Sequence, residues 1–268
     1  MRITATHTST YRYSQPLVGG LQELRLTPRP DGEQRIEQWN IELDGATEEV
    51  TFNDHNGNIV KLVSLEPGAQ SATIRCHGLV ETADTNGVVA HHGGAPLWLY
   101  RRTTQLTEAG PQVQALLHGF SADSDNRIAI LHALSAHIRA TVDYDLGWTD
   151  VASSADEVVA AGHGVCQDHS HVFLAAARHL GMSCRYVSGY LMLDHVEDQD
   201  ATHAWAEVWI ENLGWVGFDV SNQVSPDDRY VRLAVGLDYS EAAPISGLRY
   251  GEAAEELDVT LQIHQVQQ

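Results

Sequence analysis

The sequence predicts an α+β protein in two parts: a β-sandwich, then a core in which a helix packs on an antiparallel sheet. Short runs of alternating apolar and polar residues fill the first 95 positions. Apolar residues then recur at three- and four-residue steps, and strand-like runs return after residue 181. The 268 residues suit one large or two small domains, and 43% hydrophobic residues suffice for a core.

The N-terminal part is expected to consist of short strands separated by turns. The runs cover residues 3–13, 22–27, 35–43, 59–65 and 72–81. Several short strands at this spacing are typical of a β-sandwich. A polar, glycine-rich segment over 84–96 is the predicted linker, so we expect one unit over 1–95 and a second over 96–268.

Helices are expected after the linker. The runs with helical periodicity are 111–118, 125–142, 154–160 and 168–180. Glu157 follows Ser154 at the spacing of a capping box, and Gly181 stands where a glycine often ends a helix.

Strands are predicted again in the C-terminal third. They cover 183–193, 203–211, 215–219 and 257–263, whereas residues 221–251 are rich in Gly, Pro and Asp and are expected to be mostly loop.

Cys166 is the candidate nucleophile. It follows the glycine-rich turn 162–165 and opens the predicted helix over 168–180. Unpaired backbone N–H groups and the positive end of the helix dipole both favour a thiolate at such a position. A lone cysteine is as often a small buried hydrophobic residue, so its role depends on its partners. Cys76 and Cys184 lie in strand patterns and are expected to be buried and structural.

His203 and Asp219 are the partners that such a thiol needs. His203 opens one predicted strand and Asp219 closes the next. A hairpin would bring them within roughly one to three residues of facing each other, on the same side of the sheet. The carboxylate would then fix the tautomer of the imidazole, and the imidazole would form a thiolate–imidazolium pair with Cys166.

Three further residues are candidates for the surroundings of this site. The backbone N–H of Cys166 provides half of an oxyanion hole, and the second donor is expected from the Gln167 amide or the Trp148 indole. Trp205 has the same parity as His203 in its strand, so we expect it to flank the imidazole ring and line the cleft.

Composition excludes several classes of partner. A formal net charge of −20 and a pI of about 4.9 disfavour nucleic acid and anionic membranes. Three widely spaced cysteines do not suggest a disulfide framework. The N-terminus lacks a signal-peptide pattern, and no apolar run approaches the ~20 residues of a membrane span. We therefore expect a soluble protein of the reducing cytoplasm.

A cysteine–histidine metal site is the alternative that the histidines raise. His169 and His171 fall on different faces of a helix, which argues against a shared ion. His91 and His92 lie in a glycine-rich loop, where adjacent histidines are usually solvated. The acidic run 194–200 has no recognisable calcium-binding pattern. We therefore predict no metal and no other cofactor.

Four sequence motifs resemble those of the bacterial transglutaminase-like (cysteine protease) superfamily. They are GVCQD at 164–168, RYVSGY at 185–190, THAWAEVW at 202–209 and GWVGFD at 214–219. HTSTYRY at 7–13 and LRLTPR at 24–29 resemble the β-rich region that often precedes this core. The resemblance covers nearly the whole chain.

The resemblance implies a papain-like/transglutaminase-like core with a Cys-His-Asp triad. Carried over to this sequence, Cys166 is the nucleophile, His203 the general base and acid, and Asp219 the residue that orients the imidazole. The resemblance leaves the reaction open, because such relatives include proteases, amidases and transglutaminases.

We predict attack of the Cys166 thiolate on a peptide or carboxamide carbonyl, with a peptide or protein as substrate. Hydrolysis is favoured, because water is always present and nothing in the sequence marks an amine site. The alternatives are a protein-glutamine gamma-glutamyltransferase with an amine acceptor, and a non-catalytic module that holds a peptide in the same cleft.

Overall fold

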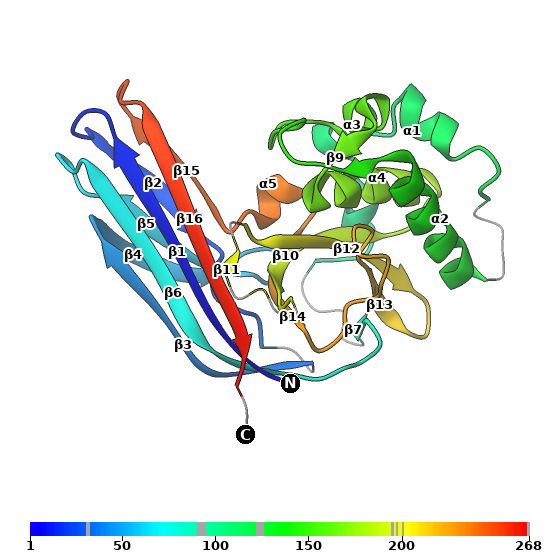
Figure 1. Ribbon diagram of the computed structural model, residues 1–268, viewed down its shortest axis with the longest axis horizontal. Coiled ribbons are helices and arrows are strands. Elements are labelled where there is room, and N and C mark those ends of the chain that lie inside the picture. Colours follow the sequence, from blue (N-terminus) through cyan, green and yellow to red (C-terminus); the bar gives the residue numbers. More distant parts are fainter. Residues whose placement is uncertain are drawn as a thin grey trace.

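Two long sheets form a sandwich beside a smaller sheet that helices cover on one face (Figure 1). The computed structural model describes residues 1–30, 33–89, 95–121, 126–193, 196, 198–199 and 201–266. The predicted α+β class is confirmed, because both the sandwich and the helix-on-sheet core are present.

The sandwich combines strands from both ends of the chain. One sheet has the order β11-β16-β1-β6-β3 and the other the order β15-β2-β5-β4. Its strands are β1 (Arg2–Tyr13), β2 (Gly19–Leu24), β3 (Gln34–Asp44), β4 (Ala46–Asn53), β5 (Ile59–Leu65), β6 (Ser71–Thr82), β11 (Asp198–Gln199), β15 (Ile245–Tyr250) and β16 (Glu255–Gln265). Buried and less buried residues alternate along β1, because a strand with one face on a core has a period of two.

The core sheet has the order β14-β10-β12-β13-β7. Its strands are β7 (Val88–Val89), β10 (Cys184–Leu191), β12 (His203–Ile210), β13 (Gly214–Phe218) and β14 (Tyr230–Gly236). The helices are α1 (Pro111–Leu116), α2 (Arg127–Thr141), α3 (Ala155–Ala161), α4 (Cys166–His179) and α5 (Tyr239–Ala242), with 3₁₀ turns η1 (Leu99–Arg101) and η2 (Gln105–Thr107). The short strands β8 (Asp143–Tyr144) and β9 (His163–Gly164) pair in parallel.

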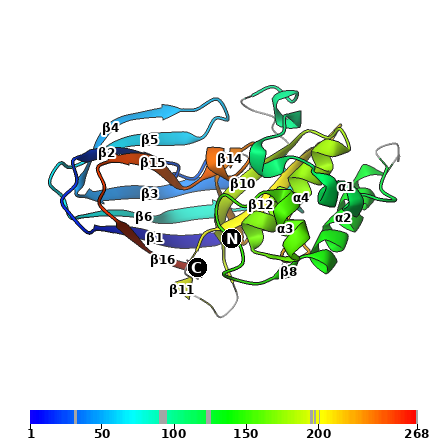
Figure 2. The same ribbon diagram turned by 90° about the horizontal axis from the view of Figure 1, so that it is seen from above.

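Helix α4 is the central helix of the core. It packs against β12 and β10 on the sheet side, while α1, α2 and α3 pack around its remaining surface (Figures 1 and 2). Val172 and Phe173 belong to the apolar core that results. The helix ends before Gly181, whose φ of +79° is the left-handed conformation that glycine adopts without strain.

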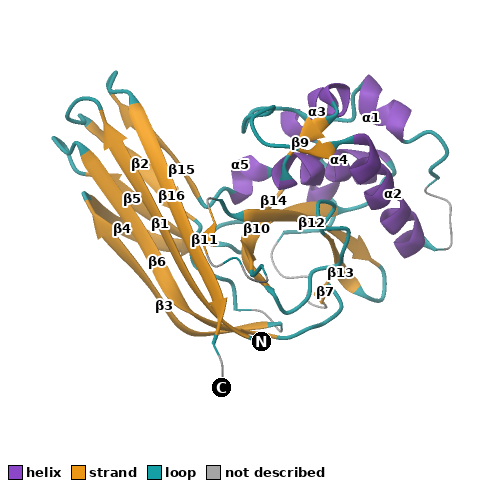
Figure 3. Cartoon of the chain, viewed as in Figure 1, coloured by secondary structure: helices purple, strands orange, loops and turns teal. Residues whose placement is uncertain are grey.

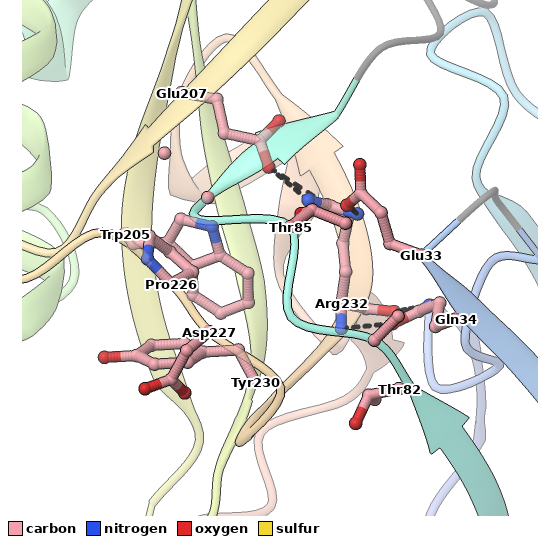
Figure 4. Close-up of a pocket in the computed structure, with 13 residues that line it drawn as sticks. Glu33, Gln34, Thr82, Thr85, Trp205, Glu207, Pro226, Asp227, Tyr230 and Arg232 are labelled. Carbon is pink, nitrogen blue, oxygen red and sulfur yellow. Dashed lines mark hydrogen bonds and ion pairs between the residues drawn. The ribbon is translucent and has the colours of Figure 1, made fainter. Parts of the chain in front are cut away.

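The two faces of β12 have different neighbours. Ala204, Ala206 and Val208 pack in the core on the side of α4. Trp205 and Glu207 alternate with them and face away from α4, toward the loops that connect the core to the sandwich (Figure 4). The small residues let the helix approach the sheet closely, and the large polar ones fill the opposite side.

Most of the predicted elements are present; the two-residue strands β7, β8, β9 and β11 were not predicted, and two larger differences remain. Strand β4 was not predicted, because its residues after Ala46 are exposed and so show no alternation. Residues 221–251 were expected to be mostly loop, but they contain β14, α5 and β15.

The sandwich contains strands from both predicted units, 1–95 and 96–268. Strand β16, correctly predicted over 257–263, pairs with β1, and β15 pairs with β2 (Figure 3). The last part of the predicted 96–268 unit therefore completes the sandwich of the 1–95 unit. No helix among the described residues is both long and apolar enough to cross a membrane.

Candidate active site

Cys166 is the first residue of α4, as the sequence predicts. One carboxylate oxygen of Asp168 accepts hydrogen bonds from the Val165 backbone N–H at 2.8 Å and from the Thr149 hydroxyl at 2.6 Å. Asp168 therefore stabilises the start of the helix. These bonds fix the backbone at the start of α4, which carries the Cys166 side chain.

The hairpin of β12 and β13 brings His203 and Asp219 together. Ala206 lies opposite Phe218, so the same register carries Asp219 to the position facing Trp205, two residues from His203. His203 Nε2 lies 2.6 Å from Asp219 Oδ2. The predicted proximity and the shared face are both confirmed by this contact.

Two residues that the sequence analysis missed also hold the Asp219 carboxylate. The Tyr230 hydroxyl donates to Oδ2 at 2.7 Å, and Asn222 donates through its side chain at 2.7 Å and its backbone N–H at 3.1 Å. The short spacing from Asp219 to Asn222 is a signal for such a turn. Tyr230 leaves no comparable local signal, because it reaches the site from a different strand.

The charge state of the pair follows from these contacts. Burial raises the pKa of Asp219, but hydrogen bonds from His203, Asn222 and Tyr230 and the imidazolium charge outweigh it, so the pKa is lowered. Burial lowers the pKa of His203, but side-chain hydrogen bonds to Asp219 and Cys166 outweigh it and raise the pKa to about 10. The imidazole is therefore held in its protonated form at neutral pH.

Cys166 and His203 lie on the wall of a cleft of about 760 Å³. Gln167 lines the same cleft, so the structure places this candidate donor near the sulfur. Tyr144 from β8 and Tyr186 from β10 contribute aromatic walls. A cleft of this size accommodates several residues of a peptide or a small organic amide.

Trp148 lies differently from the sequence-based expectation. Its side chain is 62% exposed, its indole N–H donates to the Asp145 carboxylate at 2.8 Å, and its ring stacks on His163. Trp148 is not among the described residues that line the cleft. The indole is therefore not placed as the second oxyanion donor, because a nearby carboxylate already takes its N–H.

Trp205 supports the imidazole from inside the protein. Its ring lies 6.3 Å from that of His203 at an interplanar angle of 28°, so the expected flanking contact is present. The side chain is buried and lines a small cavity of about 30 Å³ rather than the cleft, which corrects the predicted cleft-lining role. Figure 4 shows this cavity, with Tyr230 beside Trp205.

A buried ion-pair cluster lies on the far side of that cavity (Figure 4). The carboxylate of Glu207 is fully buried and lies 2.6 Å from guanidinium nitrogens of both Arg185 and Arg232. Burial raises the pKa of Glu207, but the two arginines outweigh it and lower the pKa to about 2. The cluster therefore stays ionised over the whole neutral range.

The histidines near Cys166 bond to protein atoms. His169 Nδ1 lies 2.8 Å from the Ser221 hydroxyl and its Nε2 lies 3.0 Å from the Val142 carbonyl. His171 Nε2 accepts from the Tyr239 backbone N–H at 3.1 Å. No group of three or more potential metal ligands occurs among the described residues. His91, His92 and part of the acidic run 194–200 lie outside the described residues.

The other two thiols differ sharply from Cys166. Cys76 and Cys184 are completely buried, and burial raises the pKa of each thiol to about 11. Both are free, as is Cys166. Their predicted structural role is confirmed by this burial, whereas Cys166 is half-buried and opens onto the cleft.

Comparisons with known proteins place this geometry in a family. The model of the transglutaminase-like superfamily matches residues 114–220, and that of the bacterial transglutaminase-like N-terminal region matches residues 3–81. The chain therefore belongs to the transglutaminase-like superfamily and carries its bacterial N-terminal region.

Similar proteins share this organisation over almost their full length. Uncharacterized protein ML0607 of Mycobacterium leprae is 29% identical over 98% of both chains. Uncharacterized protein Rv2569c of Mycobacterium tuberculosis is 28% identical over 98% of this chain and 92% of its own. The crystal structure of a "putative cysteine protease" from Cytophaga hutchinsonii has a TM-score of 0.79 and 19% identity, and covers 100% of this chain and 92% of its own. This last similarity establishes the shared fold.

Proposed function

We propose that this protein is a thiol-dependent amide hydrolase with Cys166 as nucleophile, His203 as general acid and base, and Asp219 as the group that orients His203. The observation that carries the proposal is the position of His203 between the other two side chains, on the wall of a cleft. Nε2 faces the carboxylate, which leaves Nδ1 for the sulfur.

The reaction begins when the thiolate sulfur of Cys166 attacks the carbonyl carbon of the substrate amide. A carbon–sulfur bond forms, and the carbonyl oxygen takes up the negative charge beside the backbone N–H of Cys166. The His203 imidazolium gives its proton to the amide nitrogen, the carbon–nitrogen bond breaks, and the amine leaves. A thioester remains on Cys166, and His203 is neutral.

Water then completes the cycle. Neutral His203 removes a proton from a water molecule while its oxygen attacks the thioester carbon, the carbon–sulfur bond breaks, and a carboxylic acid leaves. Thiolate and imidazolium are restored. A primary amine in place of water would give acyl transfer, which is the alternative activity, and Gln167 is our candidate for the second donor to the oxyanion.

The cysteine arrangement supports a reducing cytoplasm as the place of action. All three thiols are free, and an active-site thiolate is lost when it is oxidised. We propose a peptide or protein as the substrate, since a cleft of about 760 Å³ has room for several residues.

Mass spectrometry of a tryptic peptide library tests this function. The library is incubated with the protein, with and without biotinylated pentylamine, and the products are compared with those of Cys166→Ala. We expect new peptide ends or glutamine-to-glutamate conversion with the wild-type protein, little amine incorporation, and no products with Cys166→Ala. Equal products from Cys166→Ala would contradict the assignment, and predominant amine incorporation would change it to a transferase.

A further inference from the structure

The cleft at Cys166 continues toward the sandwich. A second groove of about 190 Å³ adjoins it, and the two share Ala201, Thr202 and Tyr239 as lining residues. The remaining walls of this sandwich groove come from three places in the sandwich. They are β1 with His7, Ser9 and Tyr11, the start of β15 with Pro244 and Ile245, and β16 with Leu257 and Val259. The Cys166 cleft and the sandwich groove therefore form one continuous surface.

The wall that β16 contributes to the sandwich groove is aliphatic, because the inner face of β16 extends beyond the sandwich core. Leu261 and Ile263 on this face are buried among core residues. Leu257 and Val259 have the same parity, so they face the same way, but Leu257 is 50% exposed. An exposed aliphatic side chain on a groove wall is a contact surface for another apolar group.

The rims of the Cys166 cleft are apolar as well. Leu146 on one rim is 75% exposed, and Leu193 and Val196 on the wall near β11 are 39% and 44% exposed. These side chains provide apolar contact surface for a ligand that enters the cleft.

The edge of β16 next to this groove is open. Strand β11 pairs only with Gln262 and Leu261, so no described strand covers the outer edge of β16 from Glu255 to Thr260. The chain leaves β11 through Ala201 and Thr202 and reaches His203 directly afterwards. The open edge therefore begins beside the segment that carries the imidazole.

We propose that the acyl substrate is an extended polypeptide that passes Thr202 and adds as a strand to the open edge of β16, with apolar side chains at alternate positions on Leu257 and Val259. Backbone hydrogen bonds to the edge would provide affinity, and Leu257 and Val259 would select apolar side chains that recur every second residue. The inference rests on the proposed function for the identity of the substrate. The binding itself does not require the reaction.

A binding measurement with Cys166→Ala separates the two proposals, because no turnover occurs in this variant. The probe is a fluorescein-labelled peptide of about ten residues with leucine at every second position and serine between. Its control replaces each leucine with serine. Fluorescence polarisation should give at least tenfold tighter binding of the leucine peptide, and adding Leu257→Glu should weaken that binding at least tenfold.

Val50→Glu is the matched control for the added charge. Val50 is 46% exposed on β4, at the opposite end of its sheet from β15, and this substitution should leave the affinity unchanged. Leu257→Ser, which adds no charge, should still weaken binding severalfold. Equal affinity for the two peptides, or an affinity that Leu257→Glu leaves unchanged, would overturn the proposal whatever the reactivity of Cys166.

Discussion

Two buried carboxylates of the core, Asp219 and Glu207, differ in the kind of basic group to which they bond. Both are almost fully buried, and both are ionised because hydrogen bonds and positive charges outweigh the cost of burial. Asp219 bonds to an imidazole that lies on the cleft wall, whereas Glu207 bonds to two arginines in the interior.

The difference between them lies in the partner. An imidazole can both give and take up a proton, so we propose proton transfer for the Asp219–His203 pair. Guanidinium groups remain charged at every accessible pH, so the Glu207 cluster only contributes to the structure. One strand, β12, supplies a member of each pair, and the proposed reaction uses the pair that lies on the cleft wall.

Among the variants that distinguish the roles of Asp219 and Glu207, Asp219→Asn is expected to lower kcat the most. It keeps the shape but presents the amide where His203 needs an acceptor, so kcat should fall on the order of 10²- to 10⁴-fold. The same change removes a cause that raises the pKa of His203 to about 10. The loss of activity at high pH should therefore move to lower pH, and steady-state kinetics across pH 6–11 measures both effects. An unmoved alkaline limb would remove Asp219 from this role.

Glu207→Gln should instead lower stability. It removes the buried carboxylate charge that Arg185 and Arg232 share and leaves Arg232 with Glu33 at 3.5 Å, and breaking a buried ion pair typically costs about 3–5 kcal/mol of unfolding free energy. Denaturant titration measures this loss, while kcat per folded molecule should stay near wild type. The exposed pair of Glu81 and Arg35 provides the control, because Glu81→Gln should leave the unfolding midpoint unchanged.

The Glu207 cluster also predicts a pH dependence of stability. The pKa of Glu207 is about 2 in the folded protein, below its ordinary value of 4.5, so the unfolded chain binds this proton more readily. The stabilisation is fully present above pH 4.5 and is lost as the pH falls toward 2. Glu207→Gln should flatten this part of the stability profile. A drop of equal size in the variant would assign the acid sensitivity to other groups.

Tyr230→Phe should lower kcat less than Asp219→Asn does. It removes one of several hydrogen bonds to the Asp219 carboxylate and leaves the ring packing against Trp205. We expect kcat to fall roughly tenfold, which corresponds to the loss of one hydrogen bond to a charged group. A fall as large as that of Asp219→Asn would mean that the hydroxyl takes part in the reaction itself.

The sequence predicted the candidate site because each of its members lies at the end of a locally readable element. His203 and Asp219 flank a short hairpin, so the local pattern sufficed to pair them. Cys166 opens a helix with a clear apolar face, and the resemblance to the transglutaminase-like superfamily grouped it with this pair. Tyr230 was missed because it belongs to β14, which is buried on both faces and lies within a stretch rich in turn residues.

Long-range pairing explains the remaining differences. Nothing in the residues of β15 and β16 indicates that they pair with β2 and β1, more than 200 positions away, because strand pairing leaves little local pattern. The Trp148 expectation failed for a local reason. Asp145, three residues earlier, takes the indole N–H, and sequence spacing alone does not reveal which partner a loop side chain chooses.

The rate at which each cysteine reacts with iodoacetamide at neutral pH tests the central claim most directly. Cys166 opens onto the cleft beside a protonated imidazole, whereas burial raises the pKa of Cys76 and Cys184 to about 11. Peptide mapping of the folded protein should show Cys166 labelled at least 100-fold faster than either buried thiol, and Asp219→Asn should slow it. Labelling of all three cysteines at similar rates would contradict the assignment of Cys166 as an activated nucleophile.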